Sequence, residues 1–183
     1  MRFAVLITLL LCFSPSLSAT VLLPADFRQI VDGSQIIVYG RVSDVRAEWT
    51  AGRRRIESVV TVAAADFYKG TPSRTVTIRV PGGQIGRYKS VMVGAPEFNA
   101  GDEVVLFLKA QGPAVPRIFG LNQGVFRVSV NARSGRRHVA VPIPRPRGAT
   151  RENIRRGASD RGPLPLAQFA SQVRAVVRQG GAR

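Results

Sequence analysis

Two segments between residues 66 and 108 have the hydrophobic patterns of β-strands. In 75–80 (TVTIRV), apolar and polar side chains alternate, which is typical of a strand with one buried face. In 104–108 (VVLFL) every residue is apolar, which is typical of a strand covered on both faces. The connection between them is rich in glycine and proline and is far longer than a hairpin needs. We therefore expect a pair of strands that hold one long loop, 81–98.

Similar patterns predict further strands and two helices. The first long strand, 36–45, contains Gly40 and changes phase at Val45, so we expect strong curvature and a bulge near Ser43 or Asp44. The other predicted strands are 56–67, 75–80, 102–109, 118–121 and 124–130, and the pattern is also compatible with an edge strand over 137–141. Helical spacing of apolar residues predicts a short helix over 24–32 and an amphipathic helix over 163–179.

Several short strands separated by turn residues indicate a sandwich or a barrel. About five main strands with a curved first strand favour a mainly β fold, namely a small closed or partly open OB-like β-barrel. The short N-terminal helix precedes it and the amphipathic helix follows it. The predicted organisation is a signal peptide (1–19), the OB-like domain (20–130), a basic linker rich in Pro, Gly and Arg (131–162) and the C-terminal helix (163–179).

The N-terminus has the pattern of a secretory signal peptide. Arg2 precedes an apolar run over 3–13, and small residues lead to a predicted cleavage near Ala19. The apolar run is too short for a membrane span, which needs about 20 residues. We therefore expect a secreted or periplasmic protein without a transmembrane span in its mature chain. The single cysteine, Cys12, lies in this run, so the mature chain has no thiol for a disulfide or a metal.

The formal charge of +16 is concentrated in one segment. Residues 131–161 contain 9 basic and 2 acidic residues, a balance of +7. Such a segment attracts polyanions by releasing their counterions. Outside the cytoplasm these would be anionic lipids, lipopolysaccharide or acidic polysaccharide, whereas a signal peptide argues against nucleic acid as a partner. A solvated linker with no partner is the alternative, because a run of charge alone is weak evidence of specific binding.

The order of four motifs resembles a known pattern: IIVYGRV, FYKG, TVTIRVPGG and GDEVVLFL. Over 25–130 the chain resembles small secreted bacterial proteins and, more distantly, the netrin-like, OB-fold domain of tissue inhibitors of metalloproteinases. The resemblance implies the fold and, as a partner, a secreted protease. Those inhibitors chelate the protease zinc with an N-terminal cysteine. The mature chain has no cysteine, so that mechanism is not carried over.

The chain offers little for catalysis. His138 is the only histidine, no HExxH motif is present, and the carboxylates are scattered along the sequence. We read those carboxylates as solvated partners of the many arginines. The motif PGGQIG lacks the Gly-Lys-Ser/Thr ending of a phosphate loop. These features predict a non-enzymatic protein with no cofactor and no metal.

Two segments are candidate binding sites. In the 81–98 loop, Arg87, Tyr88 and Lys89 combine cations with an aromatic ring, as sites for polyanions and sugars do. The alternative is a loop that covers one end of the barrel, with Val91, Val93 and Phe98 buried.

The second candidate is the end of the first hairpin. Trp49 lies there beside Arg53 and Arg54, either as an exposed anchor or as a half-buried cap on the barrel. The sequence thus predicts a binding module whose partner is a protein, such as a protease, or an anionic envelope component. A structural domain without a ligand is the remaining alternative.

Overall fold

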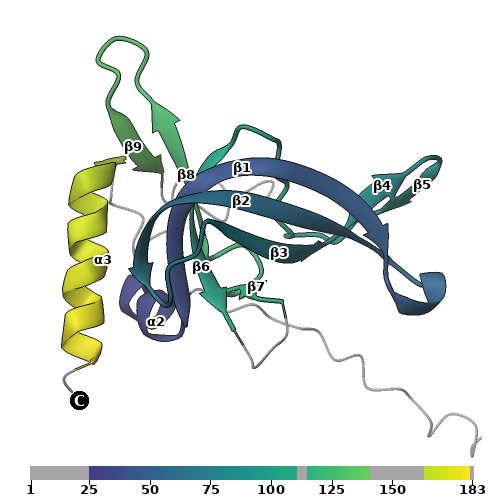
Figure 1. Cartoon of the computed structure of the whole chain (residues 1–183), viewed down its shortest axis with the longest axis horizontal. Coiled ribbons are helices and arrows are strands. Elements are labelled where there is room, and N and C mark those ends of the chain that lie inside the picture. Colours follow the sequence, from purple (N-terminus) through teal and green to yellow (C-terminus); the bar gives the residue numbers. More distant parts are fainter. Residues whose placement is uncertain (1–24, 111–114, 141–162, 182–183) are drawn as a thin grey trace, which may run out of the picture.

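The computed structural model describes residues 25–110, 115–140 and 163–181, which form a curved antiparallel sheet with two helices (Figure 1). The helices are α2 (Phe27–Asp32) and α3 (Leu166–Gly180). The strands are β1 (Ile36–Trp49), β2 (Ile56–Lys69), β3 (Thr75–Pro81), β4 (Gly83–Ile85), β5 (Tyr88–Ser90), β6 (Glu103–Lys109), β7 (Arg117–Ile118), β8 (Val125–Val130), β9 (Arg137–Ala140) and β10 (Leu164–Pro165). The mainly β fold with one short and one C-terminal helix is confirmed.

The main sheet has the strand order β10-β9-β8-β6-β1-β2-β3, and β7 also pairs with β6. Each of these pairs is antiparallel, and β4 and β5 form a separate hairpin. At the far end of the curved sheet, β3 lies near β7 but does not pair with it. The sheet is therefore not closed, and a closed barrel is not formed in the described part of the chain.

Both faces of the sheet are buried around β6. Val104, Leu106 and Leu108 pack into a core with β1, β2, β3 and β8, whereas Val105 and Phe107 point to the opposite face. There they meet α2 and α3, which cover that face. The uninterrupted apolar run in 104–108 therefore reflects burial of the strand on both faces. The alternation in 75–80 reflects burial on one face, and both agree with the sequence-based prediction.

The pairing of β1 with β2 shifts register in three places, and one of these shifts and Gly40 were predicted as sources of curvature. The pairing with β2 shifts register between Val42 and Asp44, which leaves Ser43 as the extra residue of a bulge, as predicted. At Gly40, a Cβ atom would lie only 2.4 Å from the carbonyl oxygen of Ala63, so the two backbones approach too closely for any side chain.

The two helices are stabilised by different features. Asp26 caps α2, since its carboxylate accepts a hydrogen bond from the backbone N–H of Gln29, whose side chain accepts one in return. In α3 the predicted apolar face is confirmed, because Phe169 and Val173 are buried against the sheet.

In 25–110, 115–140 and 163–181, no helix has both the length and the apolar character of a membrane span.

The structure differs from the sequence-based boundaries in several places; for example, β1 runs to Trp49 instead of ending at residue 45, and the 81–98 loop contains the β4–β5 hairpin. The strand predicted over 118–121 ends at Ile118, because Gly120 and Leu121 have positive φ angles of 54° and 60° and form a turn. The linker was predicted to begin at residue 131, but 131–136 form a turn and the edge strand that the pattern allowed over 137–141 forms as β9, so the sheet extends past residue 130. The predicted signal peptide (1–19) and the rest of the linker (141–162) lie outside the described residues.

Candidate functional site

The structure brings the two candidate binding segments together at one end of the molecule. The rings of Trp49, at the end of β1, and Tyr88, in β5, meet edge to face with their centroids 5.6 Å apart. The β4–β5 hairpin reaches Trp49 because it packs on the ends of β1 and β2. A Cβ on Gly83 would lie 3.0–3.3 Å from the side chains of Ser58, Ile56 and Ala47. The sequence named both segments but gave no reason to join them.

Arg87 contacts this aromatic pair, and further cations lie on the same two hairpins. Arg87 donates a hydrogen bond to the Tyr88 hydroxyl at 3.0 Å, and its guanidinium lies 5.2 Å from the centre of the Tyr88 ring. Exposed cations from the β1–β2 turn and the β4–β5 hairpin lie on the same segments. They are Arg53, Arg54, Arg55, Arg87 and Lys89. Within the described residues none of the five forms an ion pair. We call Trp49, Tyr88 and these five cations the aromatic–basic end.

The capping alternative for the 81–98 loop is correct for one of its three residues and wrong for the other two. Phe98 is buried in the core, as the capping alternative required. Val91 and Val93 are 71% and 93% exposed, so they cover nothing in the described structure. Between them Met92 is also exposed, and the sequence reasoning did not single it out. The available signal was the run VMV, three apolar residues between Ser90 and Gly94 inside a polar loop.

Trp49 is neither fully exposed nor buried. Its ring is half-buried, with Tyr88 packed against it, while Tyr88 itself is 50% exposed. An edge-to-face contact of this kind fixes the relative orientation of the two rings and leaves part of their apolar surface in water. The aromatic–basic end therefore joins two hairpins through a ring contact that is partly open to solvent.

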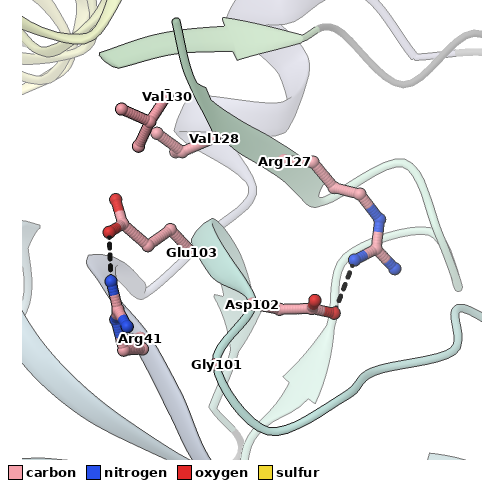
Figure 2. Close-up of a pocket in the computed structure, with 7 residues that line it drawn as sticks. All are labelled: Arg41, Gly101, Asp102, Glu103, Arg127, Val128 and Val130. Carbon is pink, nitrogen blue, oxygen red and sulfur yellow. Dashed lines mark hydrogen bonds and ion pairs between the residues drawn. The ribbon is translucent and has the colours of Figure 1, made fainter. Parts of the chain in front are cut away.

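A pocket of about 270 Å³ lies elsewhere, beside the start of β6 (Figure 2). Its lining residues are Arg41, Gly101, Asp102, Glu103, Arg127, Val128 and Val130. Figure 2 shows the adjacent carboxylates of Asp102 and Glu103 directed to different partners. Asp102 accepts from Arg127 at 2.8 Å, and Glu103 accepts from Arg41 at 2.8 Å.

Glu103 has a special environment within this pocket. Its side chain is only 8% exposed and also accepts hydrogen bonds from Arg137 and the Tyr39 hydroxyl, each at 2.8 Å. The hydrogen bond from Arg137, together with those from Arg41 and Tyr39, outweighs burial and lowers the pKa of Glu103 from 4.5 to about 2. The expectation of a solvated carboxylate is therefore wrong for Glu103, which ties β6 to β1 and β9.

This environment limits what the pocket can do chemically. A general acid must hold a proton near neutral pH. Glu103 is ionised there and is engaged by two arginines, while Asp102 is held by Arg127 and by the backbone N–H of Asn99. The arrangement joins β6 to β1, β8 and β9 and leaves no free carboxylate pair at the pocket.

Three arginines of the basic segment lie in the described part of the chain. Arg137 is engaged by Glu103, whereas Arg133 and Arg136 are exposed at the β8–β9 turn. The remaining arginines of the segment lie outside the described residues. Among the described residues, no group of three or more His, Cys, Asp or Glu side chains is placed to hold a metal ion.

Comparison with known proteins assigns no relative. No protein-family model matches the chain, and no curated protein or solved structure is significantly similar to it. The site must therefore be interpreted from its own geometry.

Proposed function

We propose that this protein is a non-enzymatic binding module that acts outside the cytoplasm, secreted or periplasmic, and holds its partner at the aromatic–basic end. The observation that carries the proposal is the contact between Trp49 and Tyr88, with five cations on the same two hairpins that have no ion pair in the described structure. Tryptophan, tyrosine and arginine are the residues that most often dominate binding energies at protein interfaces.

The scaffold supports this function. Both hairpins continue from, or pack on, the two 14-residue strands β1 and β2, which are paired along almost their whole length. Binding residues are commonly placed on loops that a rigid sheet positions. The curved sheet with β3 near β7 is compatible with an opened OB-like barrel, an architecture that binds ligands through its loops.

The first test is capture from an envelope extract. The bait is the chain without its proposed signal peptide, compared with a Trp49→Ala/Tyr88→Ala double variant. We expect the double variant to lose one or more captured components at least tenfold, because truncated hot-spot aromatics cost about 2 kcal/mol or more. Quantitative mass spectrometry measures the loss. A secreted metalloprotease among the lost components would agree with the resemblance to the inhibitor domain.

A matched control removes exposed apolar atoms elsewhere. Val115 and Val130 are 40% and 51% exposed and lie outside the aromatic–basic end. The Val115→Ala/Val130→Ala variant should capture the same components as the natural chain. If the aromatic double variant also captures an unchanged set, the proposed site is wrong.

A further inference from the structure

Exposed apolar side chains gather next to the aromatic–basic end. Among the described residues, the exposed large hydrophobic residues are Tyr88, Val91, Met92, Val93, Val115 and Val130. Four of these six fall within the six-residue stretch 88–93, and Val93 keeps 93% of its surface in water. Contiguous apolar exposure on a protein surface commonly marks a site that another molecule or a membrane covers. We call Val91, Met92 and Val93 the apolar segment.

The shape of the aromatic–basic end limits the kinds of partner that can cover it. The β4–β5 hairpin extends away from the main sheet (Figure 1), and a Cβ on Gly86 at its tip would have no neighbour within 4 Å. The same is true of Gly52 in the β1–β2 turn. The pocket beside the start of β6 and a second one between α2 and the end of α3 include no residue of the aromatic–basic end or the apolar segment. The two hairpin tips therefore protrude, and a bilayer can accept a protruding surface without a complementary shape.

The positive charge of the aromatic–basic end favours a negatively charged partner. Its five cations have no carboxylate partner in the described structure, and the whole chain carries +16. Cations beside an apolar segment suit an anionic membrane surface, where lysine and arginine contact headgroups while apolar side chains enter the acyl boundary. Tryptophan and tyrosine are enriched at that same depth.

We propose that the aromatic–basic end docks on the surface of an anionic lipid bilayer, with the apolar segment inserted and the five cations on the headgroups. This inference rests on the proposed function and names the partner of the same site. It distinguishes the end from the basic segment 131–161, whose charge alone would bind headgroups without insertion.

The natural chain provides its own probe for this test. Trp49 is the only tryptophan of the protein, so its emission reports from the proposed contact. Phosphatidylcholine vesicles with about a third phosphatidylglycerol are compared with pure phosphatidylcholine vesicles. We expect at least tenfold tighter binding to the anionic vesicles by co-sedimentation, and a blue shift of Trp49 emission. Binding should weaken as salt rises, because screening shortens the reach of the charges.

Two variants separate insertion from attraction. Val91→Ser/Met92→Ser/Val93→Ser should bind the anionic vesicles at least tenfold more weakly and lose the blue shift. Arg53→Gln/Arg54→Gln/Arg87→Gln/Lys89→Gln should lose at least tenfold in affinity and most of its salt dependence. Circular dichroism checks that both variants fold, which their exposed positions favour.

The matched controls replace side chains of the same kinds elsewhere. Val115→Ser/Val130→Ser removes exposed apolar surface, and Arg133→Gln/Arg136→Gln removes exposed charge from the β8–β9 turn. Both should keep the blue shift and bind within about twofold of the natural chain. Vesicle binding without a Trp49 shift, or equal losses in the controls, would overturn the lipid proposal.

The two proposals fail in different ways. If anionic vesicles do not bind while capture from the extract still depends on Trp49 and Tyr88, the lipid inference is wrong and the end is a site for a protein. If neither binding depends on these residues, both proposals are wrong.

Discussion

Replacing Phe107 with alanine is expected to lower the free energy of unfolding by about 3–5 kcal/mol, the range for truncating a buried phenylalanine. Phe107 is fully buried in the middle of β6. Its ring centroid lies 4.9 Å from that of Phe126 and 6.3 Å from those of Phe27 and Phe169. These rings come from β8, α2 and α3, so the substitution opens a cavity where both helices meet the sheet.

Urea denaturation at neutral pH measures this loss, since the midpoint and slope give the free energy of unfolding of a two-state domain. Phe107→Leu keeps most of the volume and should cost less than half as much. Met92→Ala, at an exposed position, should change stability by no more than about 0.5 kcal/mol. A loss below about 1 kcal/mol for Phe107→Ala would mean that the helices do not pack on this face.

Glu103→Gln is expected to remove about 2 kcal/mol of stability at neutral pH. The pKa of Glu103 falls from 4.5 to about 2 in the folded chain, a shift equivalent to about 3 kcal/mol. The partner side chains of Arg41 and Arg137 are 63% and 47% exposed, and water weakens such pairs, which reduces the expected effect.

The effect should depend on pH in a defined direction. Because the folded pKa lies below the unfolded one, the contribution of Glu103 is complete above about pH 5 and is lost as the pH falls from about 4.5 towards 2. The difference in unfolding free energy between the natural chain and Glu103→Gln should therefore shrink over that range. Denaturation curves at about pH 7, 5 and 3 measure it.

A surface ion pair provides the control for Glu103. Asp66 accepts a hydrogen bond from Arg174 at 2.7 Å, but both side chains are nearly half exposed. Asp66→Asn should change stability by less than about 1 kcal/mol. Parallel pH profiles for the natural chain and Glu103→Gln would show that the network at Glu103 does not stabilise the sheet.

Local sequence patterns were sufficient for most of the secondary structure. Alternation in 75–80 and the apolar run in 104–108 depend only on how many faces of a strand are buried, and this is encoded residue by residue. The bulge after Val42 was visible as a change of phase. The pattern failed at 118–121, where two consecutive positive φ angles override the apolar composition.

The binding end could be predicted only in pieces. The sequence indicated Trp49 with its arginines, and Arg87, Tyr88 and Lys89, as separate candidates. Their union depends on the packing of Gly83 against β1 and β2, a contact between segments more than twenty residues apart. Patterns among neighbouring residues in the chain carry no information about such a long-range contact.

The sequence by itself determined which segments are strands and helices, where the basic charge is concentrated and which residues could serve as binding side chains. Only the tertiary structure decided that the sheet stays open, that Glu103 is engaged by two arginines, and that Trp49 meets Tyr88 beside an exposed apolar segment. The physical reason is the range of the interactions. Burial patterns and turn chemistry act between neighbours in the chain, whereas ion pairs, ring contacts and exposure depend on how distant strands are brought together.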